Sequence, residues 1–430
     1  MTGNSSGLPD RAARSVIALA VLAIGPAAVL APVGMPIVLG LMAIGSIGVI
    51  VRNTGWPWHR TPRVPLWIVP GLAFLLYLPA SDLWTPLGDG AERMLRLSVL
   101  LLFAFLCWKA MAGLTEDARR FLLRTLLAGI GIAILLLMVE TASGNGIKVL
   151  LSGPAFSERP STYHRAASIL AVLAGPLAAA IWSRGHPRAA ILLSCILVAA
   201  ISVHASAAAL VAVCVGLTAT ALAAVSARLV AALGILALVA SGLVAPVIAT
   251  APKTVSAVTE AFPVPAYSSF QHRIVIWSFA ADRSAERPWL GWGVRSSRYI
   301  PGADTAIGDH VADRPALRPL VPMTLRSPTA TVMPLHPHNA PLQARLELGL
   351  AGFVLLVLAV SAALWRAASK GKTVGVAILG GALGALTIWS LSFGLWQSWW
   401  IASVLLTVVL SASLAETPEE RAARSVAARE

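Results

Sequence analysis

Residues 206–225 read SAAALVAVCVGLTATALAAV, and residues 229–250 read LVAALGILALVASGLVAPVIAT. Neither stretch contains lysine, arginine, aspartate or glutamate, and only Ser226, Ala227 and Arg228 separate them. A helix needs about 20 residues to cross the hydrocarbon core of a bilayer. Because a backbone that faces lipid must satisfy its own hydrogen bonds, such spans are helical. The two stretches therefore predict a pair of membrane helices joined by a tight turn.

The rest of the chain repeats this pattern. Of its 430 residues, 57% are hydrophobic and only 12% are charged, about half the charged fraction of a soluble protein. The apolar stretches are too long and too uniform for the alternating strands of an outer-membrane barrel. We expect an all-α polytopic membrane protein with about twelve transmembrane helices, at 15–31, 34–51, 64–80, 94–112, 121–140, 166–182, 189–203, 206–225, 229–250, 343–365, 374–392 and 395–413.

The distribution of basic residues predicts the orientation. Alternate short loops carry lysine and arginine, as at Arg52, Arg119 and Arg184, whereas the loop 81–93 carries Asp82, Asp89 and Glu92. The positive-inside rule then places both termini in the cytoplasm of a bacterial inner membrane. Topology and contact with anionic membrane lipids explain most of the net charge of +14, so no nucleic-acid partner is expected. A second span follows the first at once, so the first is interpreted as a retained anchor, not a cleaved signal peptide.

One connection is far longer than the others. We divide the chain into nine spans with short loops (1–250), a large periplasmic loop (251–341), and three spans with a basic cytoplasmic tail (342–430). Long loops in an economical chain are usually functional. Within this loop, residues 268–287 are expected to form a helix that lies on the membrane or packs on the bundle, and residues 301–337 to lack regular structure.

A series of motifs lies in and after this loop. It begins with R-x-x-x-W and P-x-x-G-x-G and continues, after a spacer, with H-x-H-N-x-x-L-Q-x-x-x-E-x-G-x-x-G at a helix entrance. The residues concerned are Arg273, Trp277, Pro288, Gly291, Gly293, His336, His338, Asn339, Leu342, Gln343, Glu347, Gly349 and Gly352. This combination resembles the O-antigen ligase family over about 80 residues, and the layout of spans extends the resemblance over the whole chain.

The resemblance implies an inverting glycosyltransferase without a metal ion or other cofactor. It would move a glycan from undecaprenyl pyrophosphate to a hydroxyl acceptor, a sugar of lipid A–core, at the periplasmic face. Related members polymerise glycan units or glycosylate proteins. Many relatives carry Ser-Arg-Gly/Ala where this chain has Ser206 followed by Ala207, with His204 nearby. This departure leaves the branch of the family, and therefore the acceptor, open.

The candidate site residues fit this chemistry. A pyrophosphate leaving group is matched by bidentate guanidinium groups, which points to Arg273 and to Arg165 from the separate outside segment 141–165. Histidine is the simplest general base near neutral pH, which points to His338. His336 and Asn339 are the remaining candidates for substrate binding. The alternatives are an exposed loop histidine for His338, the polar face of an interfacial helix for Arg273, and an interface anchor for Arg165.

Two other classes of function remain open. A transporter of lipid-linked glycans would also have twelve spans, but it should place ionisable residues inside the bilayer. A structural partner in polysaccharide assembly would need neither His338 nor Arg273. The three cysteines, Cys107, Cys195 and Cys214, lie inside predicted spans without a C-x-x-C pair and are interpreted as small core residues.

Overall fold

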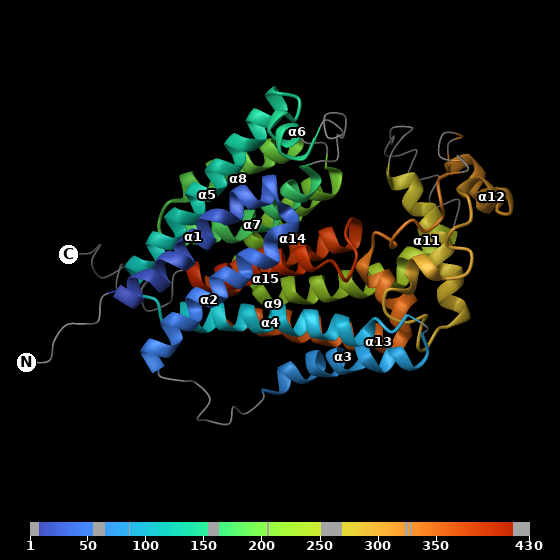
Figure 1. Ribbon diagram of the computed structural model, residues 1–430, viewed down its shortest axis with the longest axis horizontal. Coiled ribbons are helices and arrows are strands. Elements are labelled where there is room, and N and C mark those ends of the chain that lie inside the picture. Colours follow the sequence, from blue (N-terminus) through green and yellow to red (C-terminus); the bar gives the residue numbers. More distant parts are fainter. Residues whose placement is uncertain are drawn as a thin grey trace, which may run out of the picture.

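The computed structural model describes residues 8–54, 65–85, 87–153, 163–203, 206–250, 269–321, 323, 326 and 329–415. These residues form helices and no strand, apart from an isolated bridge between Ala306 and Thr331. Most of the helices run along the long axis of one bundle (Figure 1). They are α1 (Leu8–Leu30), α2 (Met35–Thr54), α3 (Val69–Ala80), α4 (Gly90–Ala112), α5 (Glu116–Ala142), α6 (Gly146–Ser152), α7 (His164–Ser183), α8 (Pro187–Val203), α9 (Ala207–Thr250), α13 (Ala340–Ala368), α14 (Val374–Leu391) and α15 (Ser398–Leu414).

The predicted membrane class is confirmed. Within the described ranges, nine helical segments are long and apolar enough to cross a membrane, and α8 and α15 are shorter apolar helices. Each expected span corresponds to one of these helices or to one half of α9. The expectation of twelve spans stays a prediction. Cys195 and Cys214 are exposed on the helix surfaces, so the interpretation of these two as core residues was wrong; Cys107 is buried.

The pair of stretches at 206–250 forms the single long element α9. Its apolar part, Ala207–Val244, has 38 residues. A straight helix of that length would extend about 57 Å, roughly twice the thickness of a hydrocarbon core. Ser226 interrupts it with a φ of −145°, so α9 consists of two helices on either side of a kink. The break lies in the Ser226–Arg228 linker, as the sequence predicts, and α13 and α14 pack along α9.

The span after the long loop is broken in a way that the sequence analysis missed. Gly349 lies inside α13 with a φ of +64°, a conformation open to glycine but strained for other residues. The break frees backbone groups, and residues 288–293 of the loop satisfy them: Leu350 and Ala351 donate to the carbonyls of Pro288 and Trp289, while Trp292 and Gly293 donate to those of Leu346 and Glu347. Such a break is tolerated at membrane depth where other protein covers the backbone.

The long loop folds around an apolar core that it shares with the start of α13. Its main helix, α11 (Ser269–Glu286), confirms the expected helix and packs on α9 and α13. The expectation of irregular structure at 301–337 was wrong in part, because α12 (Ile307–Ala312) and the 3₁₀ helix η8 (Pro315–Leu320) form there. Apolar side chains of these elements pack with Leu342 and Leu346 of α13. In Figure 1, α11 and α12 lie at one end of the bundle, here called the loop end.

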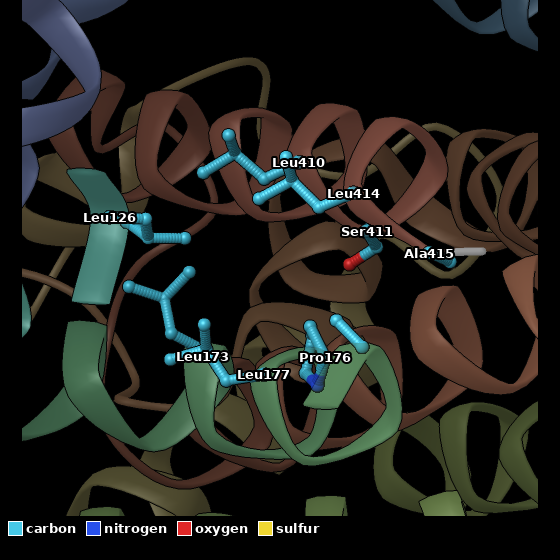
Figure 2. Close-up of a pocket in the computed structure, with 9 residues that line it drawn as sticks. Leu126, Leu173, Pro176, Leu177, Leu410, Ser411, Leu414 and Ala415 are labelled. Carbon is cyan, nitrogen blue, oxygen red and sulfur yellow. The ribbon is translucent and has the colours of Figure 1, made fainter. Parts of the chain in front are cut away.

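A small pocket between α5, α7 and α15 carries no evident chemistry. Figure 2 shows the leucine, proline and alanine side chains that line it, with one hydroxyl among them. That hydroxyl, of Ser411, donates to the backbone carbonyl of Thr407 in its own helix. We therefore treat the pocket as a gap in helix packing and look for the site at the loop end.

Candidate functional site

The segment His336-Pro337-His338 leads directly into α13 and is held from the long loop. Trp277 of α11 donates its indole N–H to the carbonyl oxygen of Pro337 over 2.9 Å. His338 has a φ of +55°, in the left-handed region that non-glycine residues seldom occupy. Strain of this kind often marks functional positions, where the surroundings hold the residue in place.

The contacts of His338 fix which ring nitrogen carries the proton. Its Nδ1 lies 2.7 Å from the backbone carbonyl oxygen of Ser392, in the turn between α14 and α15. A carbonyl can only accept, so Nδ1 is protonated and Nε2 of the neutral ring is left as a proton acceptor. Burial, with a smaller effect from the charge of Arg273, lowers the pKa of His338 to about 4, although the bond to Ser392 acts in the opposite direction. The ring is therefore neutral at ordinary pH.

His336 serves as a support for this arrangement. The backbone N–H of His338 donates to Nδ1 of His336 over 3.1 Å, which places the proton of His336 on Nε2. The side-chain amide of Gln397 lies 3.2 Å from that Nε2, and its oxygen accepts the proton once the amide is turned by 180°. Burial, followed by the neighbouring charges, lowers the pKa of His336 to about 3. Both ring nitrogens are thus engaged within the protein.

Arg273 lies on α11 one turn before Trp277, whose indole binds the carbonyl of Pro337 between the two histidines. Its charge lowers the pKa of both rings, which brings the predicted guanidinium and the predicted base into one site. Burial lowers the pKa of Arg273 from its usual value, and the group stays positively charged. The site therefore combines a neutral imidazole, which can accept a proton, with a positive charge, which can stabilise an anionic group.

The other two candidates have different surroundings. Asn339 is buried and caps α13, accepting the N–H of Leu342 over 2.9 Å, and it also contacts Ser241 of α9. Arg165 is exposed at the start of α7, where its guanidinium lies over the ring of Trp399 at 5.5 Å. No hydrogen bond in the described part of the chain joins Arg165 to His338 or Arg273. Substrate binding by either residue stays a prediction.

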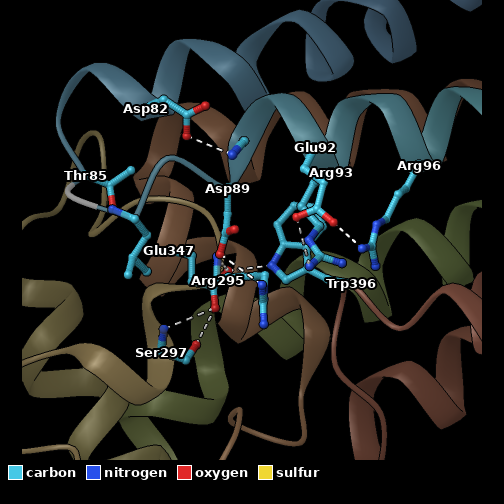
Figure 3. Close-up of polar contacts among 12 residues, drawn as sticks. Asp82, Thr85, Asp89, Glu92, Arg93, Arg96, Arg295, Ser297, Glu347 and Trp396 are labelled. Atoms are coloured by element: carbon cyan, nitrogen blue, oxygen red, sulfur yellow. Dashed lines mark hydrogen bonds and ion pairs between the residues drawn. The ribbon is translucent and has the colours of Figure 1, made fainter.

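The sequence analysis gave no role to Glu347, which turns out to be the structural centre of the site. Its carboxylate is fully buried about two turns after the cap of α13 and accepts from three segments (Figure 3). The donors are the backbone N–H groups of Arg295 and Ser297, the Ser297 hydroxyl, the Gln343 amide and the Trp396 indole. A buried carboxylate is stable only with such compensation. The E-x-G motif was the signal that marked it.

Glu347 joins the long loop to the turn between α14 and α15. Gln343, which donates to Glu347, also accepts the backbone N–H of Leu395. The same turn carries the Ser392 carbonyl that orients His338 and the Gln397 amide beside His336. The positions of both histidines therefore depend on a network that reaches three separate parts of the chain.

Part of this region is similar to known proteins. Residues 189–357 match the family model described as O-antigen ligase. The chain is 35% identical over 152 residues to the "putative polysaccharide ligase" of Rickettsia prowazekii (strain Madrid E), and 34% identical over 152 residues to that of Rickettsia typhi. These alignments cover 33% of this chain and 32% of each relative, so the chain matches about a third of the length of these relatives.

The match confirms the resemblance to the O-antigen ligase family for this segment of the chain. The matched segment contains Arg273, His336, His338, Asn339 and Glu347. Arg165 and the turn between α14 and α15 lie outside it.

Proposed function

We propose, taking residues 189–357 as an O-antigen ligase domain, that the protein transfers a glycan from undecaprenyl pyrophosphate to a saccharide hydroxyl of lipid A–core. The reaction would take place at the loop end, on the periplasmic face of the bacterial inner membrane, with both termini in the cytoplasm. The observation that carries the proposal is the state of His338. Its ring is neutral and its Nδ1–H is bound to the Ser392 carbonyl, so Nε2 carries no proton and can accept one.

The proposed chemistry is a single inverting displacement. The acceptor oxygen attacks the anomeric carbon as the bond from that carbon to the pyrophosphate oxygen breaks, and the hydroxyl proton passes to Nε2 of His338. Undecaprenyl pyrophosphate leaves with the bonding electrons, and Arg273 stabilises the negative charge that develops on it. No metal ion is required in this scheme, because the guanidinium supplies the positive charge.

Reconstitution tests the function. We expect purified protein in liposomes to join an undecaprenyl-pyrophosphate-linked glycan to lipid A–core, with release of the carrier, as seen by gel shift of the acceptor. Growth of the glycan on its carrier in place of joining would identify a polymerase. Movement of the carrier across the membrane without transfer would identify a transporter.

Replacement of Arg273 tests how the leaving group is held. Arg273→Ala is expected to slow transfer by roughly 100-fold, in the range of a lost charged contact made in the transition state. Arg273→Lys should recover only part of this loss, because an ammonium group cannot form the bidentate contact. Arg298→Ala is the matched control, since Arg298 is exposed on the same loop over Tyr299. Equal rates for the Arg273 and Arg298 variants would contradict this role.

The pH dependence should differ between free and loaded protein. His338 must be neutral to accept a proton, and its pKa of about 4 in the free protein places the acid limb of kcat/KM near that pH. A bound pyrophosphate offsets the charge of Arg273, so the pKa rises and the acid limb of kcat moves to higher pH. Measurement of both profiles in liposomes checks this. A kcat/KM limb at the ordinary histidine value of 6.5 would contradict it.

A further inference from the structure

A second group of arginines lies at the loop end, next to the turn between α14 and α15. Arg93 and Arg96 project from the start of α4, and Arg295 of the long loop lies nearby (Figure 3). Of the acids around them, Glu92 pairs with Arg96 and Asp89 pairs with Arg295 at 3.0 Å, whereas Asp82 and Glu347 accept backbone N–H groups. Arg93 therefore has no carboxylate to itself, because it shares Glu92 with Arg96.

Arg93 is held in an unusual state for a cation. Its side chain is nine-tenths buried, and among the described residues its Nε has no hydrogen-bond partner. The nearest carboxylate, that of Glu92, lies 3.7 Å from Arg93 and is already paired with Arg96. A buried donor without an acceptor costs about 1–3 kcal/mol, more when charged, so an anionic ligand at this place would remove a penalty.

The arginines form one end of a shallow groove between α4 and α15. The groove is lined by Arg93, Arg96, Leu97, Leu100, Trp396, Ser398 and Ile401. On α4 these residues follow helical spacing on one face, polar at the helix start and apolar by about 10 Å further in. Neighbouring apolar side chains such as Leu95 and Leu101 are exposed on the same helix, so the groove borders the surface that would face lipid. This order of charge and apolar surface matches a lipid with a phosphate at its head.

The groove adjoins the candidate site. Trp396 and Ser398 line it, while Ser392 and Gln397 of the same turn contact His338 and His336. One short turn thus separates Arg93 from the proposed base. A head group bound at Arg93 would have its sugars within reach of His338.

We propose that the groove between α4 and α15 binds a phosphate-bearing glycolipid acceptor, with its phosphate on Arg93 and Arg96 and a chain along Leu97 and Leu100. This inference rests on the proposed function, because the site at Arg273 is reserved for the donor pyrophosphate. It assigns the two lipid substrates to separate sites that share the turn between α14 and α15.

Kinetics in liposomes test the assignment. Arg93→Gln and Arg96→Gln should each raise the KM for lipid A–core about tenfold, the size of one charge-assisted contact, and leave the donor KM within twofold. Arg366→Gln, at an exposed arginine of α13, is the control. Removal of the lipid A phosphates should raise the wild-type KM to that of the variants and change the variants little. Arg93→Lys keeps the positive charge and serves as a control for misfolding of the Arg93→Gln protein.

Three outcomes would overturn the assignment. A rise in the donor KM of the Arg93 and Arg96 variants would indicate that the groove binds the donor and not the acceptor. An equal effect of dephosphorylation on wild type and variants would show that the phosphate binds elsewhere. A dependence on phosphatidylglycerol content with an unchanged acceptor KM would identify a bulk lipid.

Direct binding separates this proposal from the proposed function. Fluorescent phosphorylated glycolipid should bind the catalytically impaired His338→Ala protein and lose about tenfold in affinity when Arg93→Gln is added. If the wild type transfers no glycan but this difference in affinity is found, the proposed function is wrong and the proposed acceptor groove is supported. If transfer occurs and the difference in affinity is absent, the proposed acceptor groove is wrong.

Discussion

Transfer by the His338→Ala protein is expected to be slower than that of the wild type by roughly 100- to 10,000-fold, the range attributed to general acid–base catalysis. The alanine removes the only imidazole whose Nδ1 is bound by the Ser392 carbonyl and whose Nε2 stays open in the described site. The loss should fall on kcat, with the donor KM nearly unchanged, because Arg273 is retained. Initial rates at saturating donor and acceptor measure it.

The control for this variant is His186→Ala. His186 is exposed after α7, and its removal should leave transfer and protein yield unchanged. Transfer by His338→Ala within about threefold of the wild type, at equal protein level, would eliminate His338 as the base. A parallel loss of thermal stability would instead indicate that the histidine acts by holding the turn between α14 and α15.

The second large effect is expected at the break in α13. A Cβ on Gly349 would lie 2.3 Å from the carbonyl oxygen of Trp289, and the φ of +64° is strained for alanine as well. Gly349→Ala must push residues 288–293 away from α13. The Glu347 carboxylate would then lose hydrogen-bond donors from the adjoining loop residues. We expect a destabilisation of at least about 3 kcal/mol, together with loss of transfer.

Gly371→Ala distinguishes the effect of backbone strain from that of a steric clash. Gly371 has a φ of +88°, yet nothing lies within 4 Å of the place its Cβ would take. Its replacement should cost only the strain, about 1–2 kcal/mol, and preserve transfer. Thermal unfolding in detergent compares the two. Similar midpoints for both variants would show that the contact between α13 and residues 288–293 contributes little.

The sequence predicted the helices well because lipid leaves few alternatives. Apolar length sufficed to place the helices, and even the kink at Ser226 followed from a short linker between two apolar stretches. The break at Gly349 could not be predicted, because the missing backbone partners are supplied by loop residues 54 to 62 positions earlier. The same applies to α12 and η8, whose apolar residues pack on a core shared with α13.

The candidate site could be predicted in part. The motif spacing brought Arg273, His336 and His338 together, and the capping preference of asparagine was a signal for the role that Asn339 shows. The E-x-G motif marked Glu347, but its role could not be read from the sequence, because the five donors that surround the carboxylate come mostly from distant parts of the chain. The partners of the histidines, Ser392 and Gln397, offer a backbone carbonyl and an ordinary amide, for which a sequence has no distinctive pattern.

The contacts of the broken helix also bear on the order in which the protein is made. Residues 288–297 meet three partners: Trp84 and Asp89, synthesised about 200 residues earlier; Leu346 to Ala351, synthesised about 55 residues later; and Trp396, through Glu347, close to the end of the chain. The loop can therefore contact the segment before α4 as soon as it is made, but the contact of Glu347 with Trp396 can form only after α14 has been made. The network that orients His338 and His336 would then be complete only in chains that have reached the turn after α14.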